Sequence, residues 1–291
     1  MIPRADRRRR SVRYLLAVIA AAMLVRAVAA PAEPRRIMSM DMCDDLLLLM
    51  LVPRSRIASV THLAHGAATS LLPGADAGVA INHGTAEEIL RQRPDLIIGS
   101  PWAASVARRL ARQVGARMVE MDSPTDFAGI RRLVRRFGAI VGAPRRAEAL
   151  VRAMDVELAS LAARRPRRPI RVVAWSGSGS VPGRGTLTDA IITAAGAENI
   201  GARYQDTRYS SFGLEELLAA RPDAVMQGVE RYAGTSLSTG RARHPVIGRL
   251  FAGRQIEYPA AAYTCGLPQS AHAAVELRQA LDRLPPRSTR W

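Results

Sequence analysis

The chain contains no lysine, because all 42 of its basic residues are arginine. A Walker A phosphate-binding loop, a pyridoxal Schiff base and a protein-kinase active site each require a lysine, so these functions are excluded. Aromatic residues are also scarce, at 4% of the sequence. Together with the export signal described next, this scarcity argues against nucleic acid as a partner.

The first thirty residues have the pattern of a secretory signal peptide. Arg7 to Arg10 are followed by the apolar run Tyr14 to Val25 and by the small residues Ala27 to Ala30. The apolar run is shorter than the roughly twenty residues of a membrane span, although an uncleaved anchor remains the alternative. No cysteine stands at the cleavage point, which argues against a lipoprotein. We expect a periplasmic mature chain that begins near Ala30 or Pro31.

The mature chain stays basic after the signal peptide is removed. The first thirty residues hold seven arginines and one aspartate, which leaves 35 basic and 24 acidic residues, a net charge of +11. Such a charge attracts anionic ligands over long range. A length near 260 residues allows two medium-sized domains, each with its own core.

Strands alternate with helices in both halves of the mature chain, which is typical of parallel sheets covered by helices. In the first half we expect strands at 37–40, 56–60, 96–99 and 117–121 and helices at 44–51, 86–93 and 103–114. In the second half we expect strands at 171–175, 224–227 and 255–258 and helices at 187–195, 214–220 and 270–284.

Two consecutive helices separate these halves. The first helix carries an apolar stripe from Phe127 to Val141. Gly142 is expected to end this helix and Pro144 to begin the next one. The second helix runs to Ala163 and, at about 30 Å, can form a rigid connection. We therefore predict a signal peptide at 1–30, an N-terminal α/β lobe at 31–143, a connecting backbone helix at 144–168 and a C-terminal α/β lobe at 169–291.

A segment of twelve residues occurs twice in nearly the same form, at 87–98 and at 215–226. Each copy begins with two glutamates, continues as an amphipathic helix, and passes through Arg-Pro-Asp into a short apolar strand of the buried kind. A repeated helix-to-strand unit predicts two similar lobes.

These features, taken in order, resemble a known family. The matching pieces are the opening strand Arg36 to Met40, the two repeated segments, and Gly185-Thr186-Leu187 leading into Ala195 to Ile200. The chain resembles the periplasmic substrate-binding proteins of ABC importers for ferric siderophores, haem and cobalamin. The resemblance implies a class III fold, in which one long backbone helix joins two α/β lobes, and a receptor rather than an enzyme.

The resemblance also implies the partners and the cargo. The partners are an ABC permease dimer and its ATPase, and the cargo is a small-molecule metal chelate. The receptor itself is expected to be a monomer without an intrinsic cofactor. In this family one surface glutamate on each lobe docks onto arginines of the permease, and the matching residues here are Glu87 and Glu215. The simpler alternative is that both are first-turn acidic residues favoured by the helix dipole.

The ligand is expected in the cleft, because pockets in open α/β sheets form beyond the carboxyl ends of the strands. Trp102 and Trp175 could stack on a flat macrocycle or a catecholate, or could be ordinary core. The full set of candidates is Met40, Asp41, Cys43, His62, His83 and Trp102 in the first lobe, and Trp175, Tyr209, Tyr232, Tyr263 and Cys265 in the second.

The two cysteines, Cys43 and Cys265, fall in predicted cleft loops of opposite lobes, and three interpretations stay open. In an oxidising compartment they could form a disulfide. One thiolate could instead ligate a metal beside Met40, Met42, His62 or His83. Both could also be small buried residues without a further role.

Two alternatives to a chelate receptor also follow from the sequence. His62, His65 and His83 with Asp41 could bind a bare transition metal, as in zinc and manganese receptors. An exported hydrolase could use Cys265 or a serine between Ser176 and Ser180, but the Gly-x-Ser-x-Gly pattern is missing. We expect a preformed iron chelate, haem or cobalamin, held without a direct bond from the protein to the metal.

Overall fold

The computed structural model describes residues 33–65, 71–101, 104–175, 179–204, 208–229 and 244–285. The chain divides into two units, 1–33 and 34–291, and the elements below belong to the second. The predicted signal peptide, the candidates Trp102 and Tyr232, and residues 176–178 lie outside the described residues.

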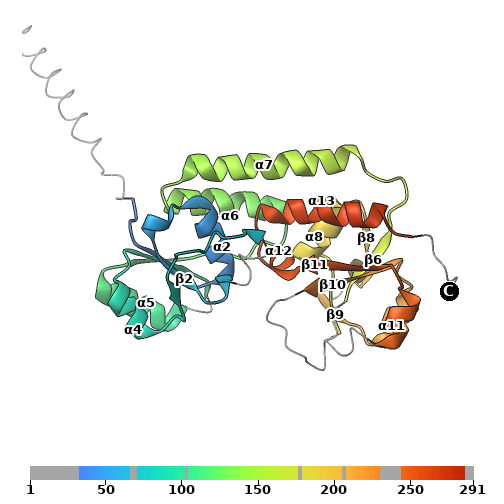
Figure 1. Cartoon of the computed structure of the whole chain (residues 1–291), viewed down its shortest axis with the longest axis horizontal. Coiled ribbons are helices and arrows are strands. Elements are labelled where there is room, and N and C mark those ends of the chain that lie inside the picture. Colours follow the sequence, from blue (N-terminus) through green and yellow to red (C-terminus); the bar gives the residue numbers. More distant parts are fainter. Residues whose placement is uncertain are drawn as a thin grey trace, which may run out of the picture. The chain divides into compact units, whose positions relative to one another are not determined.

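The N-terminal lobe contains a five-stranded parallel sheet in the order β3-β2-β1-β4-β5. Its strands are β1 (Ile37–Ser39), β2 (Ile57–Thr61), β3 (Ile81–Asn82), β4 (Leu96–Gly99) and β5 (Arg117–Glu120). Its helices are α2 (Met42–Leu51), η1 (Arg54–Arg56), α4 (Ala86–Gln92), α5 (Ala104–Val114) and α6 (Phe127–Ile140). Figure 1 shows these elements in blue and green at one end of the picture.

Alternate residues of the central strands pack on opposite faces of this sheet. Ile37 and Ile98 belong to the core that α2 and α6 cover, whereas Met38 and Ile97 pack with residues of α4 and α5. Strands buried on both faces read as continuous apolar runs, which is why the sequence predicted them correctly.

The C-terminal lobe contains a four-stranded parallel sheet in the order β11-β10-β6-β8. Its strands are β6 (Arg171–Ala174), β8 (Glu198–Asn199), β10 (Ala224–Val229) and β11 (Gln255–Pro259). The antiparallel pair β7 (Ser180–Pro182) and β9 (Tyr209–Ser211) lies outside this sheet. The helical segments are α8 (Leu187–Ala194), η3 (Ile200–Arg203), α9 (Leu214–Ala220), α11 (Pro245–Leu250), α12 (Ala260–Thr264) and α13 (Gln269–Asp282).

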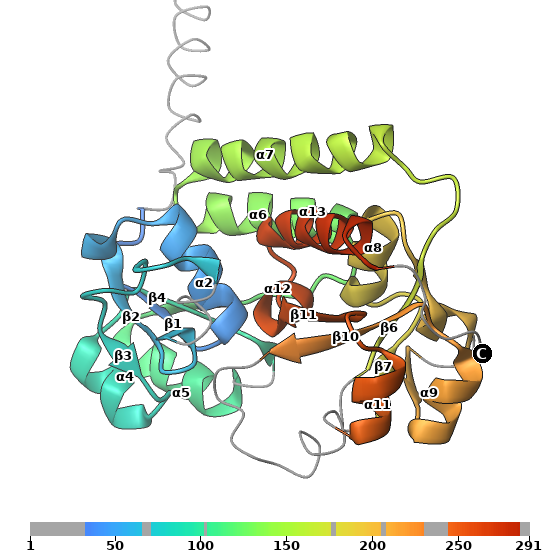
Figure 2. The ribbon, with the colours of Figure 1, turned by 45° about the vertical axis from the view of Figure 1, so that its right-hand side comes forward.

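The long helix α7 (Pro144–Ala163) begins at Pro144 and ends at Ala163, as its sequence pattern predicted, so the last five residues of the predicted connecting segment 144–168 are not part of the helix. It packs against α6 and α13 (Figures 1 and 2). Helices α6 and α7 approach so closely that a Cβ atom on Gly138 would lie 2.3 Å from the Cβ of Ala147, so a glycine is required there. Ala147, Val151 and Met154 belong to one core that includes residues of both sheets. The fold is therefore two α/β lobes joined by one long helix.

The sequence missed several short elements. These are β3, β7, β8, β9, α11 and α12, of two to six residues each, and segments so short carry little periodicity. Helix α2 begins two residues earlier than expected, because the Asp41 side chain caps it by accepting a hydrogen bond from the Cys43 N–H at 2.9 Å. Within the described ranges, none of the helices combines the length and apolar character needed to cross a bilayer.

Candidate functional site

The carboxyl ends of the N-terminal strands bring two histidines together. His62 follows β2 and His83 follows β3, and these strands are parallel neighbours. The two imidazole rings stack, with centroids 4.9 Å apart and planes inclined by 17°. The His83 side chain is 64% exposed. This pair therefore presents nitrogen ligands at the edge of the sheet where α/β proteins bind their ligands.

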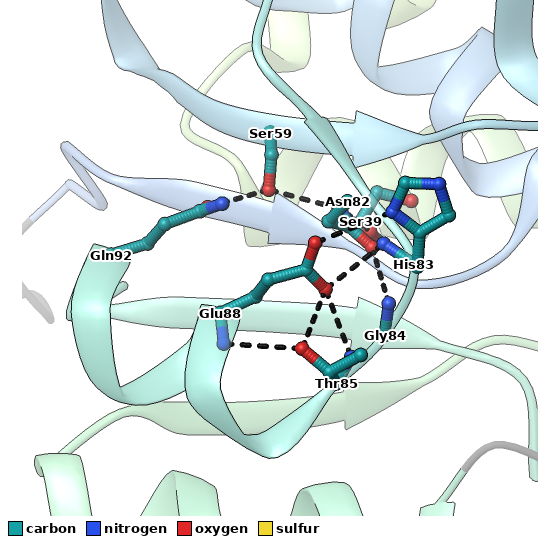
Figure 3. Close-up of polar contacts among 8 residues, drawn as sticks. All are labelled: Ser39, Ser59, Asn82, His83, Gly84, Thr85, Glu88 and Gln92. Atoms are coloured by element: carbon teal, nitrogen blue, oxygen red, sulfur yellow. Dashed lines mark hydrogen bonds and ion pairs between the residues drawn. The ribbon is translucent and has the colours of Figure 1, made fainter.

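The backbone and ring of His83 both face Glu88, at the start of α4 (Figure 3). One Glu88 carboxylate oxygen, Oε2, accepts hydrogen bonds from the His83 N–H at 3.0 Å, the Thr85 N–H at 2.9 Å and the Thr85 hydroxyl at 3.0 Å. The other, Oε1, lies 3.5 Å from Nδ1 of His83. The Thr85 hydroxyl accepts in turn from the Glu88 N–H, which completes a capping box.

These hydrogen bonds lower the pKa of Glu88 to about 2, and the largest cause is the bond from the Thr85 N–H. Burial of the carboxyl group opposes this shift, while the His83 N–H adds to it. Glu88 is therefore a carboxylate throughout the physiological pH range, and His83 faces a permanent negative charge.

A buried asparagine holds the loop that carries His83. The Asn82 Nδ2 atom donates to the Ser39 carbonyl and to the Ser59 hydroxyl, both at 2.9 Å, and Oδ1 accepts from the Gly84 N–H at 3.1 Å (Figure 3). The Ser59 hydroxyl donates to the side chain of Gln92 at 2.6 Å. Asn82 thus ties the β3–α4 loop to β1 and β2. Sequence reasoning missed its role.

A disulfide joins the two lobes. Cys43 at the start of α2 and Cys265 after α12 are bonded with an S–S distance of 2.04 Å, across 222 positions of the sequence. Residues of both lobes line the small pocket beside it, among them Asp44, Ser100 and Thr264. Cys265 is buried. With this bond formed, neither cysteine offers a thiolate as metal ligand or as nucleophile.

Two buried acids stand next to this disulfide. Burial raises the pKa of Asp44 to about 8, and the neighbouring carboxylates of Asp41 and Asp45 add to the shift. Burial also raises the pKa of Asp45 to about 6, opposed by hydrogen bonds from Ser39 and Thr61. Asp45 Oδ2 accepts from the Thr61 N–H at 3.1 Å and from its hydroxyl at 2.5 Å. Asp44 is therefore mostly protonated at neutral pH.

The aromatic candidates of the C-terminal lobe differ in exposure. Trp175 is buried and its Nε1 donates to the Phe212 carbonyl at 3.0 Å. Tyr263 is buried against Tyr258. Tyr209, in contrast, is 60% exposed. The tryptophan and the inner tyrosine thus serve the packing of the lobe, while Tyr209 is open to contact.

The two candidate docking glutamates occupy equivalent positions. Glu87 lies in the first turn of α4 and Glu215 in the first turn of α9, and both are exposed. Neither forms an ion pair or hydrogen bond with any residue that the structure describes. Glu215 borders a pocket of about 330 Å³ whose other walls include Trp175, Phe212 and His244.

The structure separates the histidines that the direct-metal alternative grouped. His65 pairs with Asp76, with Nδ1 at 2.7 Å from the carboxylate, while His62 stacks on His83. Among the described residues, no group of three or more histidine, cysteine, aspartate or glutamate side chains is arranged to hold a metal ion. The four residues of the direct-metal alternative, Asp41 included, are therefore not grouped around one site.

Comparison with known proteins gives the family. Residues 44–230 match the periplasmic binding protein family, and no curated protein matches the chain.

Similar solved structures include the periplasmic heme-binding protein HutB of Vibrio cholerae, with 22% identity, 84% of this chain and 98% of the other covered, and a TM-score of 0.69. The heme-binding protein RhuT of Roseiflexus has 21% identity, 84% and 97% coverage and a TM-score of 0.66. The molybdate-binding protein MolA of Haemophilus influenzae has 17% identity, 87% coverage of both chains and a TM-score of 0.65. At these identities the likeness establishes a shared fold. The family match extends over more than half of the sequence, so the chain belongs to the periplasmic binding protein family.

Proposed function

We propose that this protein captures a metal chelate in the periplasm and delivers it to an ABC permease. The family comprises solute-binding proteins, and membership implies a periplasmic location. Similar structures bind heme or molybdate, which supports a small metal-containing ligand. The N-terminal segment 1–30 would direct export. The two lobes would be formed by residues 31–143 and 169–291, and the connecting segment by residues 144–168.

The observation that carries this proposal is the pair of exposed carboxylates, Glu87 and Glu215, neither of which has a polar partner among the described residues. The helix dipole favours acids in a first turn, but in α4 Glu88 already completes the cap. Glu87 has no such structural task and stays in solvent. One free carboxylate at the same place on each lobe suits a partner with two like basic pockets, because charge pairs orient and steer association.

Reversal of both charges tests the docking step. The variant Glu87→Arg/Glu215→Arg should lose binding to the permease complex reconstituted in nanodiscs, because like charges then face each other across the interface. Binding of haemin, aquacobalamin and a ferric tris-catecholate to the purified variant should stay as in the wild type. Glu216→Arg is the matched control, since Glu216 is also exposed and lies in the same turn of α9. Unchanged permease binding by the double variant would reject the docking role.

The alternatives have less support from the described residues. A bare-metal receptor needs three or four protein ligands, and no such group is present among the described residues. A cysteine hydrolase needs a free thiol, whereas both cysteines are in the disulfide. A preformed chelate does not need three or four protein ligands, because the chelator itself supplies most of the metal's ligands.

A further inference from the structure

We propose that His83 bonds directly to the metal of the chelate through Nε2, and that Glu88 is the positioning residue for this bond. The inference rests on the proposed receptor function, narrows the ligand class, and replaces the sequence-based expectation that the protein makes no direct bond to the metal. A metal that accepts an imidazole must have a replaceable axial position, so the ligand is a planar metal macrocycle rather than a chelate whose coordination is complete.

The first argument concerns the two ring nitrogens of His83. Nδ1 lies 3.5 Å from the Glu88 carboxylate, so a proton on Nδ1 faces a negative charge and the lone pair is left on Nε2. Metal-binding histidines commonly have this arrangement, in which the second nitrogen faces a carboxylate that fixes the tautomer and raises the basicity of the ligand. Nε2 of His83 has no hydrogen bond to any described residue, and the side chain is 64% exposed.

The second argument is that His83 is held in place before any ligand arrives. Its own N–H donates to Glu88 at 3.0 Å, and Asn82 before it is buried and bonded to β1 and β2. Gly84 after it donates to the Asn82 side chain. A fixed ligand loses little conformational freedom on binding, which favours affinity.

The third argument is that His62 cannot be a second ligand to the same ion. The bond from an imidazole to a metal lies in the ring plane and is about 2.0–2.1 Å long for zinc. Two rings stacked at 4.9 Å and inclined by only 17° have nearly parallel planes, so one ion cannot lie in both. The site therefore offers a single axial nitrogen, and the ligand must supply the others. Imidazole suits iron, copper, nickel and zinc.

His65 is the rival and also the matched control. It too is exposed, at 70%, and pairs with a carboxylate, Asp76. However, it lies beyond the end of β2 and outside the stacked pair. A histidine that merely carries a carboxylate partner should not reproduce the effect of His83.

The experiment uses the purified mature protein and four probes. Haemin and aquacobalamin have a replaceable axial ligand, whereas cyanocobalamin and a ferric tris-catecholate serve as chelates without a readily available position. At least one of the first two should bind with the absorption change of imidazole ligation. His83→Ala should lower that affinity by about 100-fold and abolish the spectral change, and free imidazole should restore the spectrum. Glu88→Gln keeps the capping pattern and should lower affinity about tenfold with an altered spectrum. His65→Ala should behave as wild type.

The outcomes separate this inference from the receptor function. If wild-type protein binds a probe and His83→Ala binds it equally, with the same spectrum, the axial bond is rejected while the receptor function stands. The axial bond is also rejected if the wild type binds only cyanocobalamin and the ferric tris-catecholate. It is rejected as well if the spectral change is lost in His65→Ala instead of His83→Ala. If the wild type binds none of the four, the chelate function itself fails and the axial bond with it. Equal unfolding midpoints of the variants would exclude loss of folding as the cause.

Discussion

The two repeated segments end in the same way in both lobes. Helices α4 and α9 each terminate at an arginine in the left-handed conformation, Arg93 with φ 44° and Arg221 with φ 48°. The aspartate two residues later then binds the start of a neighbouring strand. Asp95 accepts from the N–H of Arg36, and Asp223 accepts from the N–H and guanidinium of Arg171. The shared sequence thus encodes the junction between a helix and two parallel strands.

The same segments differ at their other end. Helix α4 begins with the Thr85 capping box, and Glu88 is buried, whereas α9 begins at Gly213 without a side-chain cap, and Glu216 is exposed. Among the described residues, the N-terminal copy therefore holds a carboxylate by hydrogen bonds where it faces a neighbouring histidine, and the C-terminal copy does not. The two segments, which share six of their twelve residues, serve the same structural task at one end and different tasks at the other, because the residues that precede them differ.

The strongest test of the comparison removes the covalent link between the lobes. Cys43→Ser/Cys265→Ser opens a loop closed across 222 positions, and in the chain-entropy account this costs about 5 kcal/mol in the free energy of unfolding. Urea unfolding of the variant and of wild-type protein measures the difference. A second transition in the variant would show that the lobes unfold separately once unlinked. Wild-type protein unfolded under reducing conditions is the control, and an unchanged midpoint in both would contradict a stabilising role.

The next test removes the glutamate that differs between the repeats. Glu88→Ala deprives the N–H groups of His83 and Thr85 of their acceptor, and we expect a loss of about 2–3 kcal/mol in the free energy of unfolding. Glu216→Ala, at the same position of α9, should change it by less than about 0.5 kcal/mol. Equal effects in urea titrations would mean that the two caps do not differ in energy.

Much of the fold follows from the sequence, and the reasons are local. The bounds of α7 were predicted at both ends, because Pro144 can start a helix and the residues after Ala163 cannot continue one. The capping box Thr85-x-x-Glu88 is also a recognisable pattern. What the sequence could not supply is the bond from Asn82 to Ser39, since it depends on which strands become neighbours.

Exposure was equally hidden from the sequence. Trp175 and Tyr209 were both candidates for contact with the ligand, with ordinary core as the alternative for Trp175, and the structure buries the first and exposes the second. An aromatic residue after a strand can pack into its own lobe or face solvent, and its identity does not decide between these. The docking and ligand roles assigned to exposed residues therefore stay predictions, to be tested as described above.

A third comparison concerns an aspartate that is the third residue of the first helix in each lobe. Asp44 of α2 is buried and its pKa is about 8, whereas Asp189 of α8 is half-buried and accepts a hydrogen bond from Asn199 at 3.0 Å. Between pH 4 and 8 the folded protein keeps a proton on Asp44 that the unfolded chain releases, so stability falls as pH rises through this window. The substitution Asp44→Asn removes this loss of stability, because asparagine does not ionise.

We expect Asp44→Asn to stabilise the protein by about 2 kcal/mol at pH 8, after discounting the full shift for relaxation around the charge. At pH 4 the effect should fall to about 0.5 kcal/mol, because the aspartate is protonated in the folded state and nearly half protonated in the unfolded state, where its pKa is 3.8. Unfolding midpoints at the two pH values measure this. Asp189→Asn should bring no gain at pH 8, and a gain as large as that of Asp44→Asn would contradict the contrast between the two helices.

The smallest expected effect lies where the repeats are most alike, at Asp95 and Asp223. Asp223 forms two bonds with the Arg171 guanidinium, at 3.1 and 3.2 Å, and is 22% exposed. Among the described residues, Asp95 accepts only from the backbone N–H groups of Arg35 and Arg36, and it is exposed. An asparagine keeps one acceptor oxygen but loses the charge, so Asp223→Asn should cost about 1.5–2 kcal/mol and Asp95→Asn about 0.5–1 kcal/mol. Added salt should reduce the cost of Asp223→Asn only slightly, because the pair is half-buried and poorly screened. Equal costs in urea titrations would show that the guanidinium adds nothing to the strand junction, and that the two repeats are equivalent there in energy as well as in geometry.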